Sequence, residues 1–303
     1  MNDMDAVVTG ATGFIGRYLV KELLQAGYNV TAVVRDDKGI IPTDGLTVIR
    51  SALEDLSAKD LPGKYDVLFH LGWHGVNREE IDSDPVHEAS YNISLRCLEI
   101  ARQIGCRAFC DSGSRSEYGQ TGRMSEDAEC TPADAYGRWK LRFYEHAYDL
   151  CERASMEYLH YRIFSVTGVG DHEWSLVSTA CRRFLDDQRM EFGPCLQLWN
   201  YMAAEDAVKA MRMAYERIGT IKGNRILNIA SRDTRILRDF IEEIYHITNS
   251  RSELFFRPLG DSPLYHVEPD IRKLIELVGW KDEIPFREQI RRIIEDIRGI
   301  SRP

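Results

Sequence analysis

The segment that most constrains the fold is a glycine-rich run close to the N-terminus, which reads TGATGFIG over residues 9–16. It follows a short β-rich stretch at 6–9 and opens a stretch at 15–26 with helical apolar spacing. Gly10 would permit a tight turn, Gly13 would let the backbone approach a pyrophosphate, and Gly16 would let helix and strand pack closely. The amides at the helix start would face the anion; the alternative is a tight turn that binds nothing. The residues expected to contact a dinucleotide here are Gly10, Thr12, Gly13, Phe14, Ile15 and Gly16.

The first half of the chain alternates β-rich runs with helical patterns, which is typical of a parallel sheet built from right-handed crossovers. Strands are expected at 6–9, 30–34, 47–49, 67–71, 108–112 and 158–164, and helices at 15–26, 90–104 and 133–153. After residue 164 the alternation becomes irregular, with further helices expected at 205–217, 237–246 and 286–297. We therefore predict an α/β fold, a doubly wound parallel sheet of the Rossmann type with a smaller C-terminal α/β substrate domain.

The expected domain boundary follows from the same pattern. Residues 1–167 would form the dinucleotide-binding domain, with 198–230 returning to it, and 168–303 would form the substrate domain. Because no flexible linker separates them, the two domains are expected to share a rigid cleft.

Charge and composition exclude several classes of function. The net charge is −9 over 303 residues, with a pI near 5.5, whereas nucleic-acid binding usually needs a concentrated basic surface. No apolar run approaches the ~20 residues of a membrane span, and the first apolar residues lead into the glycine run rather than a cleavable signal. The seven cysteines are scattered without metal-ligand spacing. We expect a cytoplasmic protein with no nucleic-acid partner, no membrane contact and no metal site.

Arg35 bears on the choice of cofactor. The second expected strand ends Val33-Val34-Arg35, where an NAD-binding fold commonly places an acid that accepts from the ribose 2′-hydroxyl. The guanidinium of Arg35 instead offers a planar donor fork suited to a 2′-phosphate, which favours NADP(H). The alternative is a solvated loop charge.

Three side chains suggest the chemistry. Tyr136 and Lys140 stand four residues apart at the start of an expected helix and so share one face. A nearby ammonium is expected to lower the pKa of the phenol and let it act as acid or base near neutral pH. Ser114 lies in a hydroxyl-rich turn after the fifth strand, at the edge where open α/β sheets bind ligands. Ser114 and Tyr136 would stabilise the negative charge that hydride transfer builds on a carbonyl oxygen.

Together these residues resemble the extended short-chain dehydrogenase/reductase family, in its sugar-nucleotide epimerase/dehydratase group. The glycine run matches the family's cofactor loop, Ser114 precedes Tyr118-Gly119 by four residues, and Tyr136 and Lys140 match its catalytic pair. Further matches are residues 70–73 (HLGW), Asn92, 162–168 and 199–206.

The resemblance implies a nucleoside-diphosphate sugar bound between the domains and a homodimer paired through the helices at 90–104 and 133–153. It adds further cofactor contacts at Leu53, Leu71, Gly72, Trp73, Lys140 and Phe164. It implies substrate contacts at Ser114, Arg115, Tyr136, Thr167 and Trp199.

Departures from the family pattern reduce the number of reactions that are expected. Ala52 replaces an Asp that often contacts adenine, and Trp199 stands where many epimerases carry a phosphate-binding Arg. Arg115 and Ser116 occupy the positions of an Asp-Glu pair that 4,6-dehydratases use in elimination, so dehydration is not expected.

The end of the second strand and the HLGW segment resemble deoxysugar-nucleotide 4-ketoreductases. The first hypothesis is therefore NADPH-dependent reduction of a nucleoside-diphosphate 4-keto-6-deoxyhexose. The alternatives are a hexose-nucleotide 4-epimerase with a retained cofactor and a non-catalytic NADP-binding regulator.

Overall fold

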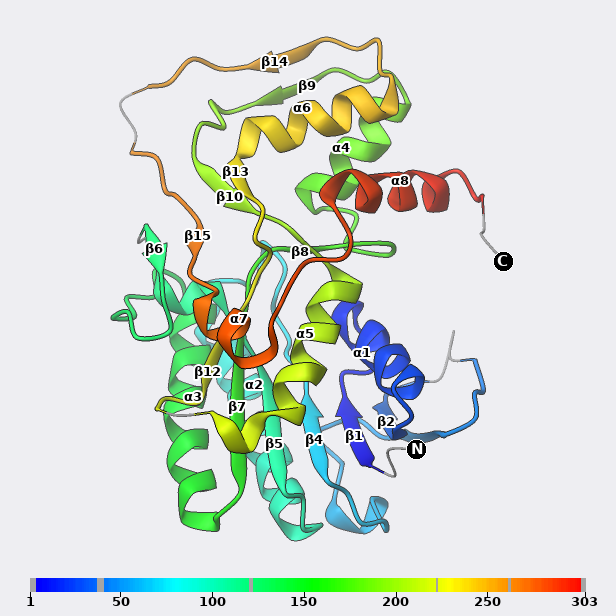
Figure 1. Cartoon of the computed structure of the whole chain (residues 1–303), viewed down its shortest axis with the longest axis vertical. Helices are drawn as coiled ribbons and strands as arrows, with labels where there is room; N and C mark the ends of the chain where they lie inside the picture. The colour runs from blue at the N-terminus through cyan, green and yellow to red at the C-terminus, as the bar shows by residue number, and fades with distance from the viewer. Residues whose placement is uncertain (1–3, 37–40, 120–121, 222, 261–262, 301–303) are drawn as a thin grey trace.

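A seven-stranded, wholly parallel sheet forms the centre of the computed structural model, which describes residues 4–36, 41–119, 122–221, 223–260 and 263–300 (Figure 1). The strand order is β12-β7-β5-β4-β1-β2-β3. The strands are β1 (Asp5–Thr9), β2 (Asn29–Val34), β3 (Leu46–Arg50), β4 (Val67–His70), β5 (Ala108–Ser114), β7 (Glu157–Ile163) and β12 (Ile226–Ile229). The order reverses between β1 and β4, so ligands are expected beyond the carboxyl ends of these two strands.

Helices cover both faces of the sheet because consecutive strand residues point in opposite directions. Val8 of β1 packs in one hydrophobic core with α1 (Phe14–Gln25) and α5 (Ala204–Glu216). Val7 packs in a second core with α2 (Asp84–Gln103) and α3 (Ala135–Ala154). The predicted doubly wound architecture is therefore confirmed. Pairing of two chains through α2 and α3 stays a prediction.

A smaller lobe, at the top of the view in Figure 1, has its own core. The core consists of α4 (Leu176–Leu185), α6 (Leu237–Thr248) and α8 (Phe286–Ile297), with Phe184, Phe240 and Phe286 among its buried rings. Short paired strands complete the lobe and its junction with the sheet. They are β8 (Val166–Thr167) with β11 (Met202–Ala203), β9 (Met190–Phe192) with β14 (Leu254–Phe256), β10 (Leu198–Asn200) with β13 (Thr234–Ile236), and β6 (Arg123–Met124) with β15 (Glu268–Pro269). A last helix, α7 (Arg272–Val278), packs on α5 and β12.

One contact fastens α1 to the start of the smaller lobe. Arg17 donates a hydrogen bond to the carbonyl oxygen of Val169 over 2.9 Å, and the Tyr18 hydroxyl donates to the same oxygen over 2.9 Å. Arg17 also donates to the carbonyl of Gly170, so the loop after β8 is held by the first turns of α1.

The expected elements differ from the observed ones in three places. The helix expected from Ser90 begins at Asp84, because Pro85 occupies its first turn, where a proline costs no hydrogen bond. The irregular region after residue 167 contains α4, which begins at Ser175, whose side chain accepts from Ser178 N. No strand is expected at β12, which lies in the segment 198–230 and forms one edge of the central sheet. The position of the boundary between the lobes stays a prediction.

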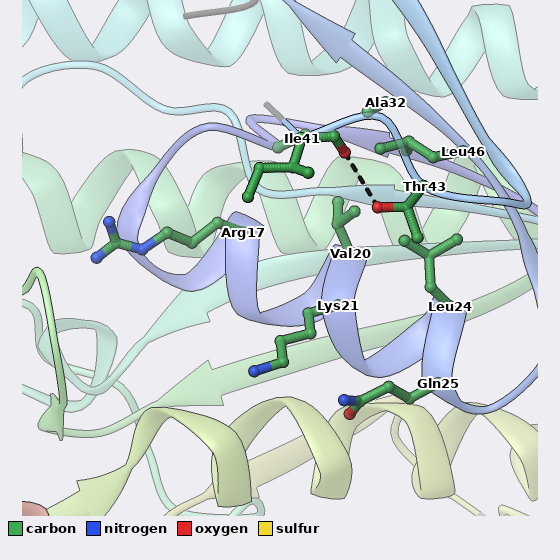
Figure 2. A pocket seen from close by; sticks show the side chains of 10 residues that line it. Arg17, Val20, Lys21, Leu24, Gln25, Ala32, Ile41, Thr43 and Leu46 are labelled. Carbon is green, nitrogen blue, oxygen red and sulfur yellow. Dashed lines mark hydrogen bonds between the residues drawn. The ribbon is translucent and has the colours of Figure 1, made fainter. Parts of the chain in front are cut away.

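A hollow of about 530 Å³ lies between α1 and the β2–β3 edge (Figure 2). The described residues of the β2–β3 connection, 35–36 and 41–45, form no helix over this flank of α1. Apolar side chains of Val20, Leu24 and Leu46 line the hollow, and Figure 2 shows Arg17 and Lys21 along the same helix. Within the described ranges, no helix combines the length and the apolar character needed to cross a membrane.

Candidate active site

The glycine turn packs backbone against backbone. Gly10 has a φ of +69°, in the left-handed region, and a Cβ there would lie 2.7 Å from the amide nitrogen of Gly72. A Cβ on Gly16 would collide with the carbonyl oxygen of Gly10. The turn after β1 therefore lies directly against the segment that follows β4, at the point where the strand order reverses.

The start of α1 suits an anion. Gly13 is the N-cap, no side chain caps the helix, and the first turn contains no acidic residue. The leading amides thus have no side-chain acceptor, and the helix dipole adds partial positive charge. Thr12 and Gly13 are exposed, and Phe14 and Ile15 are partly buried. These residues fit the pyrophosphate of a dinucleotide, which the exposed backbone of Thr12 and Gly13 would let approach.

Five other predicted cofactor residues lie in three places around the glycine turn. Leu71 and Gly72 border Gly10, and a Cβ on Gly72 would collide with Leu53, so these residues form one wall beside the glycine turn. Arg35 lies exposed at the end of β2, on the side of the sheet where an adenosine ribose would lie. Phe164 is buried after β7 and packs its ring 6.2 Å from that of Tyr118.

The predicted catalytic side chains converge at the same edge of the sheet. Asp134 caps α3 by accepting from the amide of Gly137 over 2.7 Å, which starts the helix so that Tyr136 and Lys140 lie one turn apart. Ser114 ends β5 and is buried beside them, within hydrogen-bonding reach of Tyr136. The Ser114 hydroxyl oxygen also accepts from the amide of Ser116 over 3.1 Å.

Lys140 is buried beneath Trp73. Its Nζ donates to the carbonyl oxygen of Ser112 and lies 4.0 Å from the centre of the Trp73 ring. Burial lowers the pKa of Lys140 to about 8, against the opposing effect of the Asp111 and Glu117 carboxylates. The ammonium therefore begins to lose its proton only slightly above neutral pH.

The expected lowering of the Tyr136 pKa is wrong for this structure. Burial raises the pKa of the phenol well above its ordinary value, while hydrogen bonding to Ser114 and the charge of Arg115 act in the opposite direction. Desolvation outweighs the nearby cations because the phenolate would be charged in an apolar setting. Tyr136 is therefore protonated at neutral pH, the form that donates to a developing oxyanion.

The histidines near this edge serve packing. His70 is buried, and burial lowers its pKa to about 3, so the ring is neutral. It hydrogen-bonds Thr9 over 2.7 Å and Ser94 over 2.8 Å, which ties β1 and α2 to β4. Trp73 donates its indole N–H to Nδ1 of His87 over 3.2 Å, and this pair borders the ring of Tyr136.

The predicted substrate residues lie where the smaller lobe meets the sheet. The Arg115 guanidinium lies 5.0 Å from the centre of the Trp199 ring. A hollow of about 260 Å³ borders both of them. It is lined by Arg115, Ser116, Gly119, Met124, Ala133, Asp134, Trp199, Tyr265, His266 and Val267. Thr167 is buried on β8, and its hydroxyl has no hydrogen-bond partner among the described residues.

A model of the NAD dependent epimerase/dehydratase family matches residues 6–230. The chain belongs to this family. The UDP-glucose 4-epimerase of Mycolicibacterium smegmatis is 27% identical, over 98% of this chain and all of that protein. The dTDP-6-deoxy-L-talose 4-dehydrogenase (NAD(+)) of Aggregatibacter actinomycetemcomitans is 26% identical, over 79% of this chain and 89% of that protein.

Among solved structures, MoeE5 in complex with UDP-glucose and NAD is similar with a TM-score of 0.85 and 27% identity. The match covers 98% of this chain and all of that one. The predicted family resemblance is thus confirmed, and the chain is an enzyme of the extended short-chain dehydrogenase/reductase type. A 4-ketoreductase subtype is not specifically supported.

In this member of the epimerase/dehydratase family, a buried charge network that sequence reasoning missed supports the catalytic turn. Glu117 accepts from the Ser114 amide over 2.6 Å and from Arg162 Nε over 2.8 Å. His160 lies between two carboxylates, with Nδ1 2.9 Å from Asp111 and Nε2 3.0 Å from Glu117. We name Asp111, Glu117, His160 and Arg162 the Glu117 network.

The protonation states in the Glu117 network follow from burial and charge. Burial alone would lower the pKa of His160, but Asp111 and Glu117 together raise it to about 9. Burial alone would raise the pKa of Glu117, but His160, Arg162 and the Ser114 amide bring it down to about 2. At neutral pH Glu117 is therefore ionised and His160 is protonated. The available signal was the presence of His160 and Arg162 two residues apart in a buried strand, on one face of the sheet.

Proposed function

We propose that the chain is a nucleotide-sugar 4-epimerase that oxidises and re-reduces its substrate on one retained nicotinamide dinucleotide. The observation that carries this proposal is the convergence of Ser114, Tyr136 and Lys140 at the sheet edge that also holds the glycine turn. The likeness to the M. smegmatis epimerase and to MoeE5 supports it, because those proteins are named for or bound to UDP-sugars.

Each catalytic side chain has a role in this reaction. The dinucleotide, when bound, accepts a hydride and later returns it. In its ionised form, which Lys140 and the positive charge of a bound oxidised nicotinamide would favour against burial, Tyr136 would accept the proton of the sugar 4-hydroxyl as the C4 hydride leaves, and Ser114 would hold the same oxygen by a hydrogen bond. On the return, the 4-keto sugar would present its opposite face to the dinucleotide, and Tyr136 would give the proton back to the same oxygen. Lys140 would hold the ribose and favour the phenolate during the first step. One hydride and one proton leave and return, so no net oxidation occurs.

The second candidate is the NADPH-dependent 4-ketoreductase of the first hypothesis. Arg35 favours it, because an exposed guanidinium at the end of β2 suits a 2′-phosphate. The likeness to the A. actinomycetemcomitans 4-dehydrogenase supports it as well. The comparisons as a whole support the epimerase alternative more strongly.

One experiment separates the two candidates. The purified protein is denatured and the released nucleotide is identified, and the native protein is incubated with UDP-glucose or UDP-galactose without added cofactor while C4 inversion is followed by NMR. The epimerase proposal expects a bound dinucleotide and inversion. NADPH oxidation that requires a 4-keto-6-deoxyhexose nucleotide, with no inversion of any UDP-hexose, would establish the reductase instead.

A further inference from the structure

Arg115 is a half-buried cation without an acidic partner. Among the described residues, no carboxylate lies within ion-pair distance of its guanidinium, which lies 5.0 Å from the centre of the Trp199 ring. By contrast, the Arg162 guanidinium is engaged by Glu117 over 2.8 Å. A guanidinium has five N–H donors, so a partly desolvated one with no acceptor is a group prepared for an anion.

The position of Arg115 places this anion beside the reacting centre. Arg115 follows Ser114 directly at the end of β5, and it lies close enough to Tyr136 for its charge to act on the phenol. The charge of Asp134 acts on Arg115 from beyond ion-pair distance, and its carboxylate caps α3 by accepting from the Gly137 amide. Arg115 also borders the hollow of about 260 Å³ at the junction of the lobes.

We propose that Arg115 binds a carboxylate on the sugar ring itself, so that the enzyme prefers nucleotide-linked uronic acids to neutral hexoses. The proposal rests on the proposed function, which places C4 between Ser114 and Tyr136. On a hexopyranose the carbon next to C4 that carries a carboxylate in a uronic acid is C5. A guanidinium one residue beyond Ser114 is therefore suited to the C5 substituent, and its planar fork matches the two carboxylate oxygens.

Trp199 supports this geometry. Its ring lies against the guanidinium, and a cation held over an aromatic face keeps its N–H edge free for an acceptor in the plane. The diphosphate of the substrate is the other anion that could reach Arg115. The two sources differ in one measurable respect, because every nucleoside-diphosphate sugar contains the diphosphate and only uronic acids contain the carboxylate.

The test compares UDP-glucuronate, UDP-glucose and UDP, with the thymidine diphosphate sugars as a second set. Binding constants are measured by calorimetry on the protein with its bound dinucleotide. The wild-type protein is expected to bind the glucuronate at least 10-fold more tightly than the matching glucose nucleotide, as expected for a charge-assisted bidentate contact. Arg115→Gln is expected to reduce this ratio by about 10- to 100-fold, and Arg115→Lys by less.

Arg107→Gln is the matched control. Arg107 precedes β5 at the opposite end of the sheet, and its side chain is 78% exposed. This variant should keep the wild-type ratio. The melting temperature of each variant shows whether it folds, and the wild-type ratio tests the proposal without any variant.

Each outcome decides one question. A wild-type preference for glucose over glucuronate overturns the Arg115 proposal, and so does an unchanged ratio in Arg115→Gln. An equal loss of affinity for UDP and both sugars in Arg115→Gln assigns the guanidinium to the diphosphate and also overturns it. If none of the nucleotides or nucleotide sugars binds, the proposed function itself fails.

Discussion

The glycine turn and the catalytic turn lie at the same edge of the sheet but are held in different ways. Around Gly10 and Gly16 the backbone is fixed by direct contact, and no side chain fits between the strands and the helix. Around Ser114 the backbone is fixed by a buried carboxylate, Glu117, which His160 and Arg162 keep charged. The glycine turn depends on the absence of side-chain volume, and the catalytic turn depends on buried charge. A larger side chain should therefore disturb the first turn, and a change of pH should disturb the second.

The largest effect is expected from a change that removes the reactive phenol and leaves the contacts around both turns in place. Tyr136→Phe deletes only the phenolic oxygen and is expected to reduce kcat by about 100- to 10,000-fold, since proton transfer in the transition state is lost. Affinity for the dinucleotide should change little. Tyr148→Phe, on the same helix, is the control. Turnover by Tyr136→Phe at the wild-type rate would remove Tyr136 from the reaction.

The next effect tests the dependence of the glycine turn on volume. Gly16→Ala places a Cβ against the Gly10 carbonyl, so the turn must shift, with a cost of about 1 to 3 kcal/mol. We expect a lower melting temperature and at least a 10-fold loss of dinucleotide affinity, measured by fluorescence titration. Gly122→Ala is the control, because a Cβ there meets open space. Equal behaviour of the two variants would contradict the steric account.

A pH series tests the dependence of the catalytic turn on charge. The pKa of His160 is raised to about 9 from its ordinary 6.5, so its contribution to stability is complete below pH 6.5 and disappears as the pH rises through 9. The free energy of unfolding of the wild type should therefore exceed that of His160→Asn by about 1 to 3 kcal/mol more at pH 6.5 than at pH 9.5. Chemical denaturation at both pH values measures this difference. A pH-independent gap between the two proteins would show that His160 is not charged in the fold.

The smallest effect is expected at Arg35, where the adenosine half of a dinucleotide would lie. Arg35 is exposed, so Arg35→Asp should leave stability unchanged while repelling a 2′-phosphate and offering an acceptor to a 2′-hydroxyl. We expect the ratio of NADP(H) to NAD(H) affinity to fall by about 10-fold. An unchanged ratio would make Arg35 a solvated loop charge.

The glycine turn could be predicted from the sequence, whereas the charged residues behind the catalytic turn could not. The glycine turn and the spacing of Tyr136 and Lys140 are local patterns, because a turn type and a helical repeat are set within a few residues, and the structure has both. The direction of the Tyr136 pKa shift was predicted wrongly, since desolvation depends on every element packed around the phenol. The Glu117 network joins residues from β5, the turn after it and β7, which only the sheet register brings together.

Parts of the fold were hidden for a similar reason. The strand β12 is four residues long and is recognisable as a strand only because it pairs with β7. The helix α4 has apolar residues, such as Val177 and Phe184, that pack into the smaller lobe rather than onto the sheet. In both cases tertiary packing rather than local propensity decides the element.

The hydrogen bonds from Arg17 and Tyr18 to Val169 join the helix that would face the dinucleotide to the loop that begins the smaller lobe. The helix turn that would face the dinucleotide also fastens the first loop of the lobe that would cover the sugar. Protein stripped of its dinucleotide should therefore lose affinity for sugar nucleotides as well. Preparations that keep the dinucleotide bound would then keep the affinity for sugar nucleotides.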